Sequence, residues 1–492
     1  MRPRSLGVLA LVVLALGAFV WFYERKLPTT AEAKAQAKKL LPGVEADEVR
    51  EVVIERGGQK VRLVREGEPP PTTPAGEEEM AGPPSEWRLT APLAARADRT
   101  QVEGLLASLL GMEKGRTLEH ADRRQYGLEP PAARVTLVTA KARRVVDVGR
   151  EIPATDERAV ALAGASGGPA TVYAVAGSFW GDLAKPTGDW RSRELFPGAR
   201  EEVERVSLHR DGGSSGGNLG STQGATVVLA RRGEEPWIEA PLADHADRER
   251  FDQLLDALTA LQAIDFLDQP PGPPATLGLA PPQGVIEAVR KAKPQPFRLE
   301  LGATHGEGEQ AVQYARVDGQ LVTLKAPALG EALARPPQEW RSRTWTDFAV
   351  YEVDKLVARD HQGAFTLTRA DADWKRDGVK IFYGTVSDLL GTLADAKATK
   401  VLDAAAAQGL AAGAPALTLE LTGTGGKRQT LTVWPATAGA AGEGAPARTS
   451  GRDALLLMPA ALPADLAKEI AAIRKAEPLK PEATPAPPAP GQ

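Results

Sequence analysis

The chain has 492 residues, which at about 150 residues per domain predicts about three domains. Charged residues make up 25% and hydrophobic residues 42% of the sequence, values that exclude a globally disordered protein. The formal net charge of −4 argues against a basic protein that seeks phosphate, so no nucleic-acid partner is expected. The sequence has no cysteine, which excludes a cysteine nucleophile, a zinc ribbon, an iron–sulfur site, a disulfide scaffold and an acylated lipoprotein cysteine.

An uncharged apolar run near the amino terminus predicts a membrane anchor. Leu6–Tyr23 would span about 27 Å as a helix, with Arg2 and Arg4 before it and charged residues at 24–26 after it. A cleaved signal peptide is the alternative, but bulky side chains fill 19–23, where cleavage needs small ones. We therefore expect residues 1–26 to form a cytoplasmic tip and a transmembrane anchor, with the lipid bilayer contacted through Leu6–Tyr23.

The charges beside this run predict its orientation. Arg2 and Arg4 favour an amino terminus in the cytoplasm, although Arg25, Lys26 and the lysines of 34–39 weaken the asymmetry. Long domains cross the membrane largely regardless of such charges. We expect a single pass through a bacterial inner membrane, with the bulk of the chain in the periplasm.

The remainder of the chain repeats itself. Lys39–Arg56 (KLLPGVEADEVREVVIER) recurs as Arg193–Arg210 (RELFPGAREEVERVSLHR), and Tyr351–Asp360 is a fainter third copy. The copies recur about every 150 residues.

Further landmarks follow in the same order. The first is a tryptophan that opens a strand and then a helical pattern, at Trp87, Trp237 and Trp374; the second is a Gly-Leu turn, at 127–128, 278–279 and 409–410. A Trp-Arg-Ser-Arg motif then closes the first two copies at 190–193 and 340–343. These landmarks predict three repeat units, 40–193, 194–345 and a degraded third at 346–476, with a stalk at 27–39 and a disordered Pro/Ala tail at 477–492.

Each unit has the pattern of an α+β fold. The Val-x-x-Val-x-Ile spacing predicts a half-buried strand, a second strand follows it, and the tryptophan begins a third with its ring in the core. Asp98, Asp247 and Thr385 are candidate N-caps of one amphipathic helix per unit, and the Gly-Leu turn ends the helical segment because glycine accepts a positive φ. The pattern predicts a mostly antiparallel sheet with one main helix in each unit, behind the transmembrane helix. Glu68–Pro84 and Asp211–Gly224 are predicted to be loops.

No motif predicts chemistry. The five histidines, His120, His209, His245, His305 and His361, share no i, i+3 or i+4 spacing, so each is interpreted as a surface or loop residue. We accordingly predict no catalytic residue, no cofactor-binding residue, no metal ligand and no cofactor.

The arginines of the repeated Trp-Arg-Ser-Arg motif are the best candidates for a binding role. Arg191, Arg193, Arg341 and Arg343 could grip anionic groups in a bidentate manner. The alternative is that each pairs with a carboxylate such as Asp189 or Glu339 at a junction between units. We favour the alternative, because a feature present at two junctions is more natural for a scaffold than for a single active site.

The anchor, the Leu-Leu-Pro-Gly segment before the first strand, the Trp-strand-helix element and the Tyr-Gly-Leu-x-Pro-Pro turn together resemble a bacterial family, the domain of unknown function 4340. The third unit departs most, because it lacks the proline of Ala-Pro-Leu and the double proline after Gly-Leu. The resemblance implies a single-pass envelope protein, often encoded beside ABC transporters of the gliding-motility type. It implies no catalytic residue.

Two functions remain open on this basis. The first is a non-enzymatic, membrane-anchored periplasmic scaffold or accessory subunit that works with an ABC-type transport or motility complex. The second is an envelope module that binds or hydrolyses glycan or peptidoglycan, for which hydrolysis would need two placed carboxylates. A cleft with converging acids and aromatic rings at one junction would favour the second function, and a closed repetitive surface would favour the first.

Overall fold

The computed structural model describes residues 34, 36–67, 86–118, 122–162, 171–210, 226–291, 293, 295–371, 373–439 and 442–479. The expected anchor Leu6–Tyr23, the expected loops, and most of the stalk and tail lie outside these residues. Across the described ranges, no helix has both the length and the apolar character that crossing a membrane requires.

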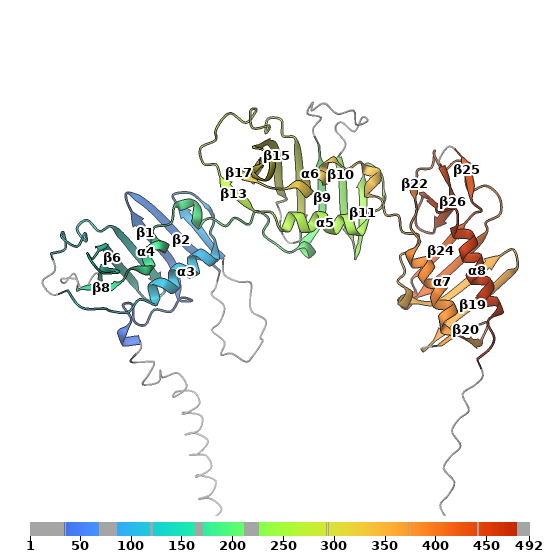
Figure 1. Ribbon diagram of the computed structural model, residues 1–492, viewed down its shortest axis with the longest axis horizontal. Helices are drawn as coiled ribbons and strands as arrows, with labels where there is room; N and C mark the ends of the chain where they lie inside the picture. The colour runs from blue at the N-terminus through green and yellow to red at the C-terminus, as the bar shows by residue number, and fades with distance from the viewer. Residues whose placement is uncertain are drawn as a thin grey trace, which may run out of the picture. The chain divides into compact units, whose positions relative to one another are not determined.

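The chain divides into two compact units, which meet in sequence between Arg193 and Glu194. The first unit holds one antiparallel sheet, and the second unit holds two (Figure 1).

The sheet of the first unit has eight strands in the order β4-β3-β2-β1-β5-β6-β7-β8. Their bounds are β1 (Val49–Arg56), β2 (Gln59–Glu66), β3 (Glu86–Ala91), β4 (Ala95–Arg96), β5 (Ala133–Thr139), β6 (Arg143–Glu151), β7 (Glu157–Leu162) and β8 (Val172–Ala176). Helices α3 (Arg99–Leu110) and α4 (Trp180–Leu183) contact each other, and α3 packs its leucines into the core beside the sheet.

The first sheet of the second unit has nine strands in the order β12-β11-β10-β9-β14-β15-β16-β17-β13. Their bounds are β9 (Val203–His209), β10 (Thr226–Arg232), β11 (Glu235–Ala240), β12 (Asp244–His245), β13 (Ala263–Phe266), β14 (Gly284–Arg290), β15 (Phe297–His305), β16 (Val312–Val317) and β17 (Gln320–Leu324). Helices α5 (Arg248–Thr259) and α6 (Pro327–Ala334) pack beside its core.

The second sheet of this unit has ten strands, ordered β21-β20-β19-β18-β23-β24-β26-β27-β22, with β25 paired to β26. Their bounds are β18 (Val353–Asp360), β19 (Gly363–Ala370), β20 (Asp373–Arg376), β21 (Val379–Ile381), β22 (Lys400–Leu402), β23 (Leu417–Gly423), β24 (Arg428–Val433), β25 (Thr437–Gly439), β26 (Gly442–Thr449) and β27 (Leu455–Met458). Helices α7 (Tyr383–Asp395) and α8 (Leu462–Lys475) contact each other and supply leucines and isoleucines to its core.

The three sheets share one plan, which confirms the mostly antiparallel α+β repeats. The carboxylates of Asp98 and Asp247 cap α3 and α5. Each accepts a hydrogen bond from the main-chain N of the third helical residue, Gln101 at 3.1 Å and Arg250 at 3.0 Å. Thr385 is not a cap, because α7 begins two residues earlier, at Tyr383. Each main helix is joined by a second helix, α4, α6 or α8, that the sequence analysis did not anticipate.

The tryptophan landmark is equivalent in only two of the repeats. Trp87 and Trp374 are buried, and they face equivalent partners, Arg65 of β2 and Arg369 of β19. Trp237 is half-buried and lies opposite Ala230, while its neighbours Pro236 and Ile238 point into the core. The expectation of three equivalent buried rings is therefore wrong for Trp237.

A one-residue deletion explains this difference. Four positions separate Trp87 from Ala91, whereas three separate Trp237 from Ala240, the corresponding residue of the Ala-Pro-Leu motif. Because side chains alternate across a strand, a shift of one residue moves the ring to the other face.

The Gly-Leu turn is repeated in all three units, but the expectation that it ends the main helix is wrong. Helices α3, α5 and α7 end at Leu110, Thr259 and Asp395, well before the turn. Gly127, Gly278 and Gly409 have φ of +65°, +66° and +81°, the left-handed region that favours glycine. In the first two repeats the turn is followed by the same cis X-Pro bond, at 129–130 and 280–281.

An arginine at the same place in each sheet forms hydrogen bonds to the segment that leads into the first strand of its repeat. Arg65 donates to the carbonyls of Ala46 and Asp47, Arg231 to that of Arg200, and Arg369 to that of Tyr351, over 2.8–3.5 Å. These contacts use main-chain oxygens, so they do not depend on the side chains of the segment they hold.

The sheet faces away from the main helices are charged. Ion pairs join neighbouring strands on each of them: Arg62–Glu51 and Arg134–Asp147 in the first sheet, Arg298–Glu287 in the second and Arg359–Glu420 in the third. In the second sheet, Arg205 of β9 also pairs with Glu239 of β11, across the intervening strand β10. An antiparallel sheet with one face on its core and one face in water has this pattern.

Candidate functional site

The Trp-Arg-Ser-Arg segment at 340–343 joins the two sheets of the second unit through main-chain hydrogen bonds. The carbonyl of Trp340 accepts from Asp247 N at 2.7 Å, and Ser342 N donates to the carbonyl of His245 at 2.8 Å. One residue later, the carbonyl of Arg343 accepts from Ala398 N at 2.7 Å, in the segment after α7. The motif is therefore hydrogen-bonded to one repeat and then to the next.

The first unit closes with the same arrangement. The carbonyl of Trp190 accepts from Asp98 N, and Ser192 N donates to the carbonyl of Arg96, both at 2.9 Å. The repeated motif thus has a repeated main-chain role.

A buried ion cluster strengthens the junction at 340–343. Asp244 of β12 accepts from Arg341 Nε at 2.6 Å and from Arg452 at 2.7 and 2.9 Å, and these side chains are 2–4% exposed. Arg452 lies between β26 and β27 of the third repeat and also donates to the carbonyl of Ser342 at 2.8 Å. Asp244 and Arg452 are 208 residues apart in sequence, so the cluster connects two repeats.

The electrostatics of Asp244 follow from this arrangement. Burial acts to raise the pKa of its carboxyl, but the hydrogen bonds and charges of Arg452 and Arg341 outweigh burial and hold the pKa below its ordinary value. Asp244 is thus held as the anion between two guanidinium groups.

The structure gives the Trp-Arg-Ser-Arg arginines different partners. Arg193 lies 4.0 Å from the carboxylate of Asp189, as expected. Arg341 binds Asp244 and the carboxylate of Asp403 rather than the adjacent Glu339. Arg191 is also buried, but the residue that corresponds to Asp244 in the first repeat is Ala95. Asp244 and Arg452 were not among the predicted residues, because no local motif in the sequence relates them.

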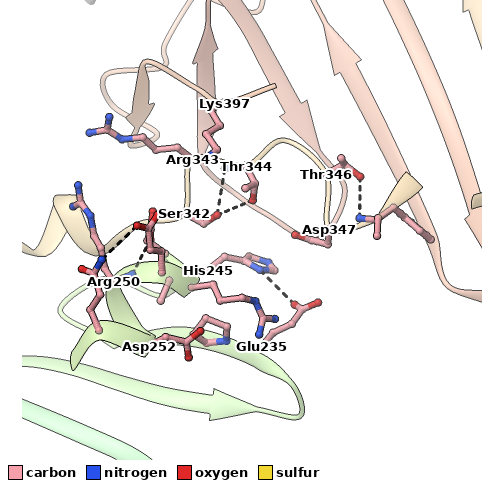
Figure 2. A pocket seen from close by; sticks show the side chains of 18 of the residues that line it. Glu235, His245, Arg250, Asp252, Ser342, Arg343, Thr344, Thr346, Asp347 and Lys397 are labelled. Atoms are coloured by element: carbon pink, nitrogen blue, oxygen red, sulfur yellow. Dashed lines mark hydrogen bonds and ion pairs between the residues drawn. The ribbon is translucent and has the colours of Figure 1, made fainter. Parts of the chain in front are cut away.

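A cleft of about 960 Å³ opens beside this cluster, between the β11–β12 hairpin, the start of α5 and residues 342–349 (Figure 2). Its wall carries both charge signs, with acids that include Asp252 and Asp256 and bases that include Arg250, Arg343 and Lys397. Phe348 is the aromatic side chain among the described residues that line it. The cleft is therefore polar, and its charges partly offset one another.

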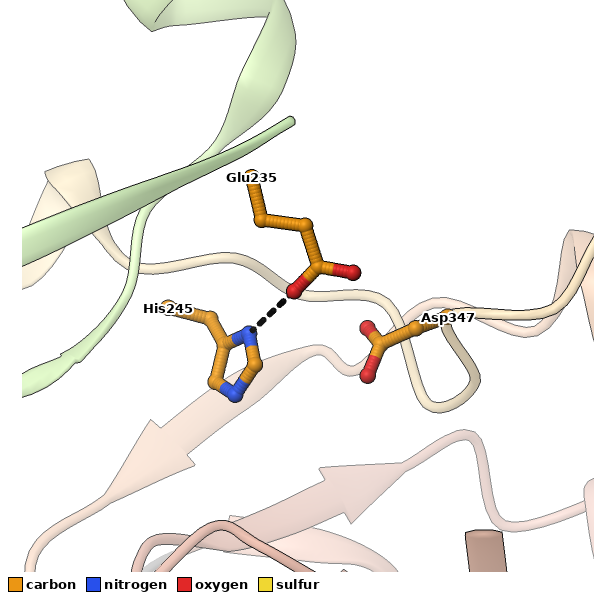
Figure 3. Close-up of side chains that lie close together, drawn as sticks. All are labelled: Glu235, His245 and Asp347. Atoms are coloured by element: carbon orange, nitrogen blue, oxygen red, sulfur yellow. Dashed lines mark ion pairs between the residues drawn. The ribbon is translucent and has the colours of Figure 1, made fainter. Parts of the chain in front are cut away.

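Three side chains at one end of the cleft are placed to hold a metal ion. One ligand atom from each of Glu235, His245 and Asp347 lies within 4.8 Å of the other two (Figure 3). Glu235 and His245 belong to the second repeat, and Asp347 lies in the segment that enters the third. None of the three was predicted as a metal ligand, because Glu235 and Asp347 lie 10 and 102 positions from His245 and form no local motif with it.

The other histidines are placed differently. The Nδ1 of His209 lies 3.0 Å from the hydroxyl of Thr226, and His305 and His361 are exposed. His120 lies outside the described residues.

Comparison with known proteins gives one result. A family described as a domain of unknown function (DUF4340) matches residues 87–282 and, in a second copy, 237–413. Each match runs from the tryptophan of one repeat to the Gly-Leu turn of the next. No curated protein and no solved structure matches the chain significantly.

Proposed function

The chain belongs to the family of the domain of unknown function DUF4340, and from that premise we propose a non-enzymatic role. The protein is a single-pass, membrane-anchored scaffold or accessory subunit in the periplasm, and it works with an ABC-type transport or motility complex. Leu6–Tyr23 provides the anchor and a helix for lateral contact within the bilayer.

The observation that carries this proposal is the construction of the junction at 340–343. The segment is hydrogen-bonded on both sides, and the cluster of Asp244, Arg341 and Arg452 is removed from water. A buried bidentate ion pair fixes geometry more than it adds stability. Such a junction keeps two repeats at a set spacing, which is what a scaffold needs from its domains.

The cleft supports a second candidate, an envelope module that binds or hydrolyses glycan. It lies at a junction and is lined by several carboxylates, as that function requires. Its lining has Phe348 as its aromatic residue, and its acids are interleaved with arginines and a lysine. A wall of mixed charge with a single phenylalanine among its described residues favours the scaffold over a glycan site.

Capture from membranes tests the scaffold. The full chain with a tag after Gln492 is purified from detergent-solubilised membranes, beside a matched form in which an unrelated transmembrane helix replaces Leu6–Tyr23. We expect ABC-type membrane proteins to accompany the native form and to be depleted from the matched form. If ABC-type membrane proteins co-purify with neither form, the proposal is contradicted.

Two further measurements separate the alternatives. Alkaline phosphatase fused after Gln492 should be active, and a silent fusion beside a fluorescent cytoplasmic reporter would contradict the topology. The glycan module would be favoured if the native chain released labelled fragments from peptidoglycan and Asp252→Asn lost this activity. The control is Glu420→Gln, on the charged face of the third sheet and outside the cleft, which should keep the activity.

A further inference from the structure

We propose that Glu235, His245 and Asp347 form a binding site for a divalent transition-metal ion of the zinc class, which links the second and third repeats. The three ligand atoms lie within 4.8 Å of one another, and His245 Nδ1 is 3.7 Å from a carboxylate oxygen of Glu235 (Figure 3). The site stands apart from the scaffold proposal, since it follows from these side chains alone.

The donor set selects the class of ion. One imidazole nitrogen with carboxylate oxygens suits zinc and similar ions, whereas magnesium and calcium prefer oxygen ligands throughout. Zinc binds nitrogen and oxygen at about 2.0–2.2 Å, so its ligand atoms stand about 3.3–3.6 Å apart in a tetrahedron. His245 Nδ1 and the carboxylate oxygen of Glu235 are close to that spacing at 3.7 Å, and the three ligand atoms, which lie within 4.8 Å of one another, would draw closer on binding. Three protein ligands leave a fourth position for water or for a donor from a partner.

His245 is held in place by the buried cluster beside it. Its main-chain N donates to Asp244 Oδ1 at 2.9 Å, and its carbonyl accepts from Ser342 N at 2.8 Å. Its ring lies against that of Trp237, with centroids 4.6 Å apart, and its side chain is 20% exposed. The one-residue shift that takes Trp237 out of the core therefore places it behind a ligand.

Asp347 is oriented by a buried amide. Gln429 Nε2 donates to Asp347 Oδ2 at 2.9 Å, and Gln429 Oε1 accepts from Asp347 N at 3.2 Å. Gln429 is 5% exposed and also accepts from the hydroxyl of Thr346. This support leaves the other carboxylate oxygen of Asp347 for the ion. Outer groups of this kind commonly orient metal ligands.

Lys427 lowers the affinity of the site for a metal ion. Its ammonium lies 3.8 Å from Glu235 Oε1 and donates to the carbonyl of Asp347 at 3.0 Å. A positive charge at this distance repels a divalent ion, so the lysine weakens metal binding. Its removal by Lys427→Met should strengthen binding by about 10-fold, by Coulomb's law at high effective dielectric.

Calorimetric titration of the full chain in detergent, freed of metal by a chelator, tests the site with zinc chloride. We expect one saturable site that is weakened at least about 100-fold in His245→Ala and Glu235→Gln, more than the loss typical of outer-shell variants. His305→Ala is the matched control, because that histidine is exposed on β15 and should leave binding unchanged. Cobalt(II) in place of zinc should give visible absorption bands of a low-coordinate nitrogen and oxygen site, lost in His245→Ala.

Folding of each variant is checked by circular dichroism. Glu235→Gln keeps the test decisive if His245→Ala is unstable, because the Glu235 side chain is 39% exposed and glutamine has nearly the same shape. Absence of saturable binding would overturn the proposal, as would binding that persists in both ligand variants. Asp347→Asn serves as the third arm, and unchanged affinity there would overturn the link to the third repeat.

Discussion

Removal of Asp244 should uncouple the second and third repeats. Asp244→Ala leaves two buried guanidinium groups facing each other: Arg341 keeps Asp403, which is 61% exposed, and Arg452 keeps the carbonyl of Ser342. Removal of one member of a buried ion pair costs about 3–5 kcal/mol, because the remaining charge loses its partner. Arg452→Met should cost less, about 1.5–3 kcal/mol, since Asp244 still binds Arg341.

Differential scanning calorimetry of the full chain in detergent measures this effect. One kcal/mol shifts the melting temperature of a domain of this size by about 2–4 °C, so Asp244→Ala should lower the melting of the second unit by about 6–20 °C. The melting of the first unit should not change. Lys60→Ala is the matched control: it removes the exposed Lys60–Glu55 pair, and such pairs contribute about 0–1 kcal/mol.

The effect of Asp244 on stability depends on pH with a known sign. Its pKa is lower in the folded state than in the unfolded chain, so its contribution is fully present above the unfolded value of about 3.9 and is lost as the pH falls through the folded value. The difference between native protein and Asp244→Ala should be constant from pH 5 to 8 and should shrink in acid below about pH 4. A loss below about 1 kcal/mol at neutral pH, equal to that of Lys60→Ala, would refute the role of the cluster.

Other variants test the packing of single repeats by chemical denaturation. Trp87→Ala should cost about 3–5 kcal/mol, whereas Trp237→Ala, on the other sheet face, should cost less than half as much; equal losses would contradict the one-residue shift. Burial and nearby carboxylates raise the pKa of Glu469, so its negative charge destabilises the folded protein at pH 7. Glu469→Gln should therefore raise the free energy of unfolding at pH 7 by about 0.5 kcal/mol, a value that allows for solvent screening. The gain should vanish as the pH falls through the unfolded pKa of about 4.3, where the carboxyl is protonated in both states. A β-carbon at Gly278 would meet a backbone amide at 2.7 Å, so Gly278→Ala should cost more than Gly233→Ala, which has a similar φ and open space; equal costs would contradict the steric argument.

Local patterns in the sequence predict most of the fold. The caps at Asp98 and Asp247, the glycine turns and the strand alternation act over a few residues, so a single sequence reveals them. Trp237 shows the limit of this reasoning. The tryptophan is still recognisable in the sequence, but the one-residue deletion moves its side chain to the other face of the sheet. The short helix α6 carries an apolar pattern of its own, yet it lies outside the landmarks that were compared between repeats.

The candidate site depends on contacts between distant residues. Asp244 meets Arg452 across 208 positions, and His245 meets Asp347 across 102. Such pairs become neighbours only when two sheets are placed side by side, and no spacing rule for helices or strands predicts that placement. A single sequence therefore predicts the repeats and misses what is built between them.

The arginine that bonds to the start of each repeat has a consequence for how the sequence of such a chain can evolve. Arg65, Arg231 and Arg369 grip peptide oxygens, which every amino acid supplies, so the gripped segment is free to drift in composition. It reads Ala-Asp in the first repeat, while the gripped residues of the others are Arg200 and Tyr351. A duplicated copy would thus arrive with its own attachment and could diverge without losing its architecture. The third repeat lacks the prolines of two landmarks, yet it keeps this contact through Arg369 and shares the plan of the other two repeats.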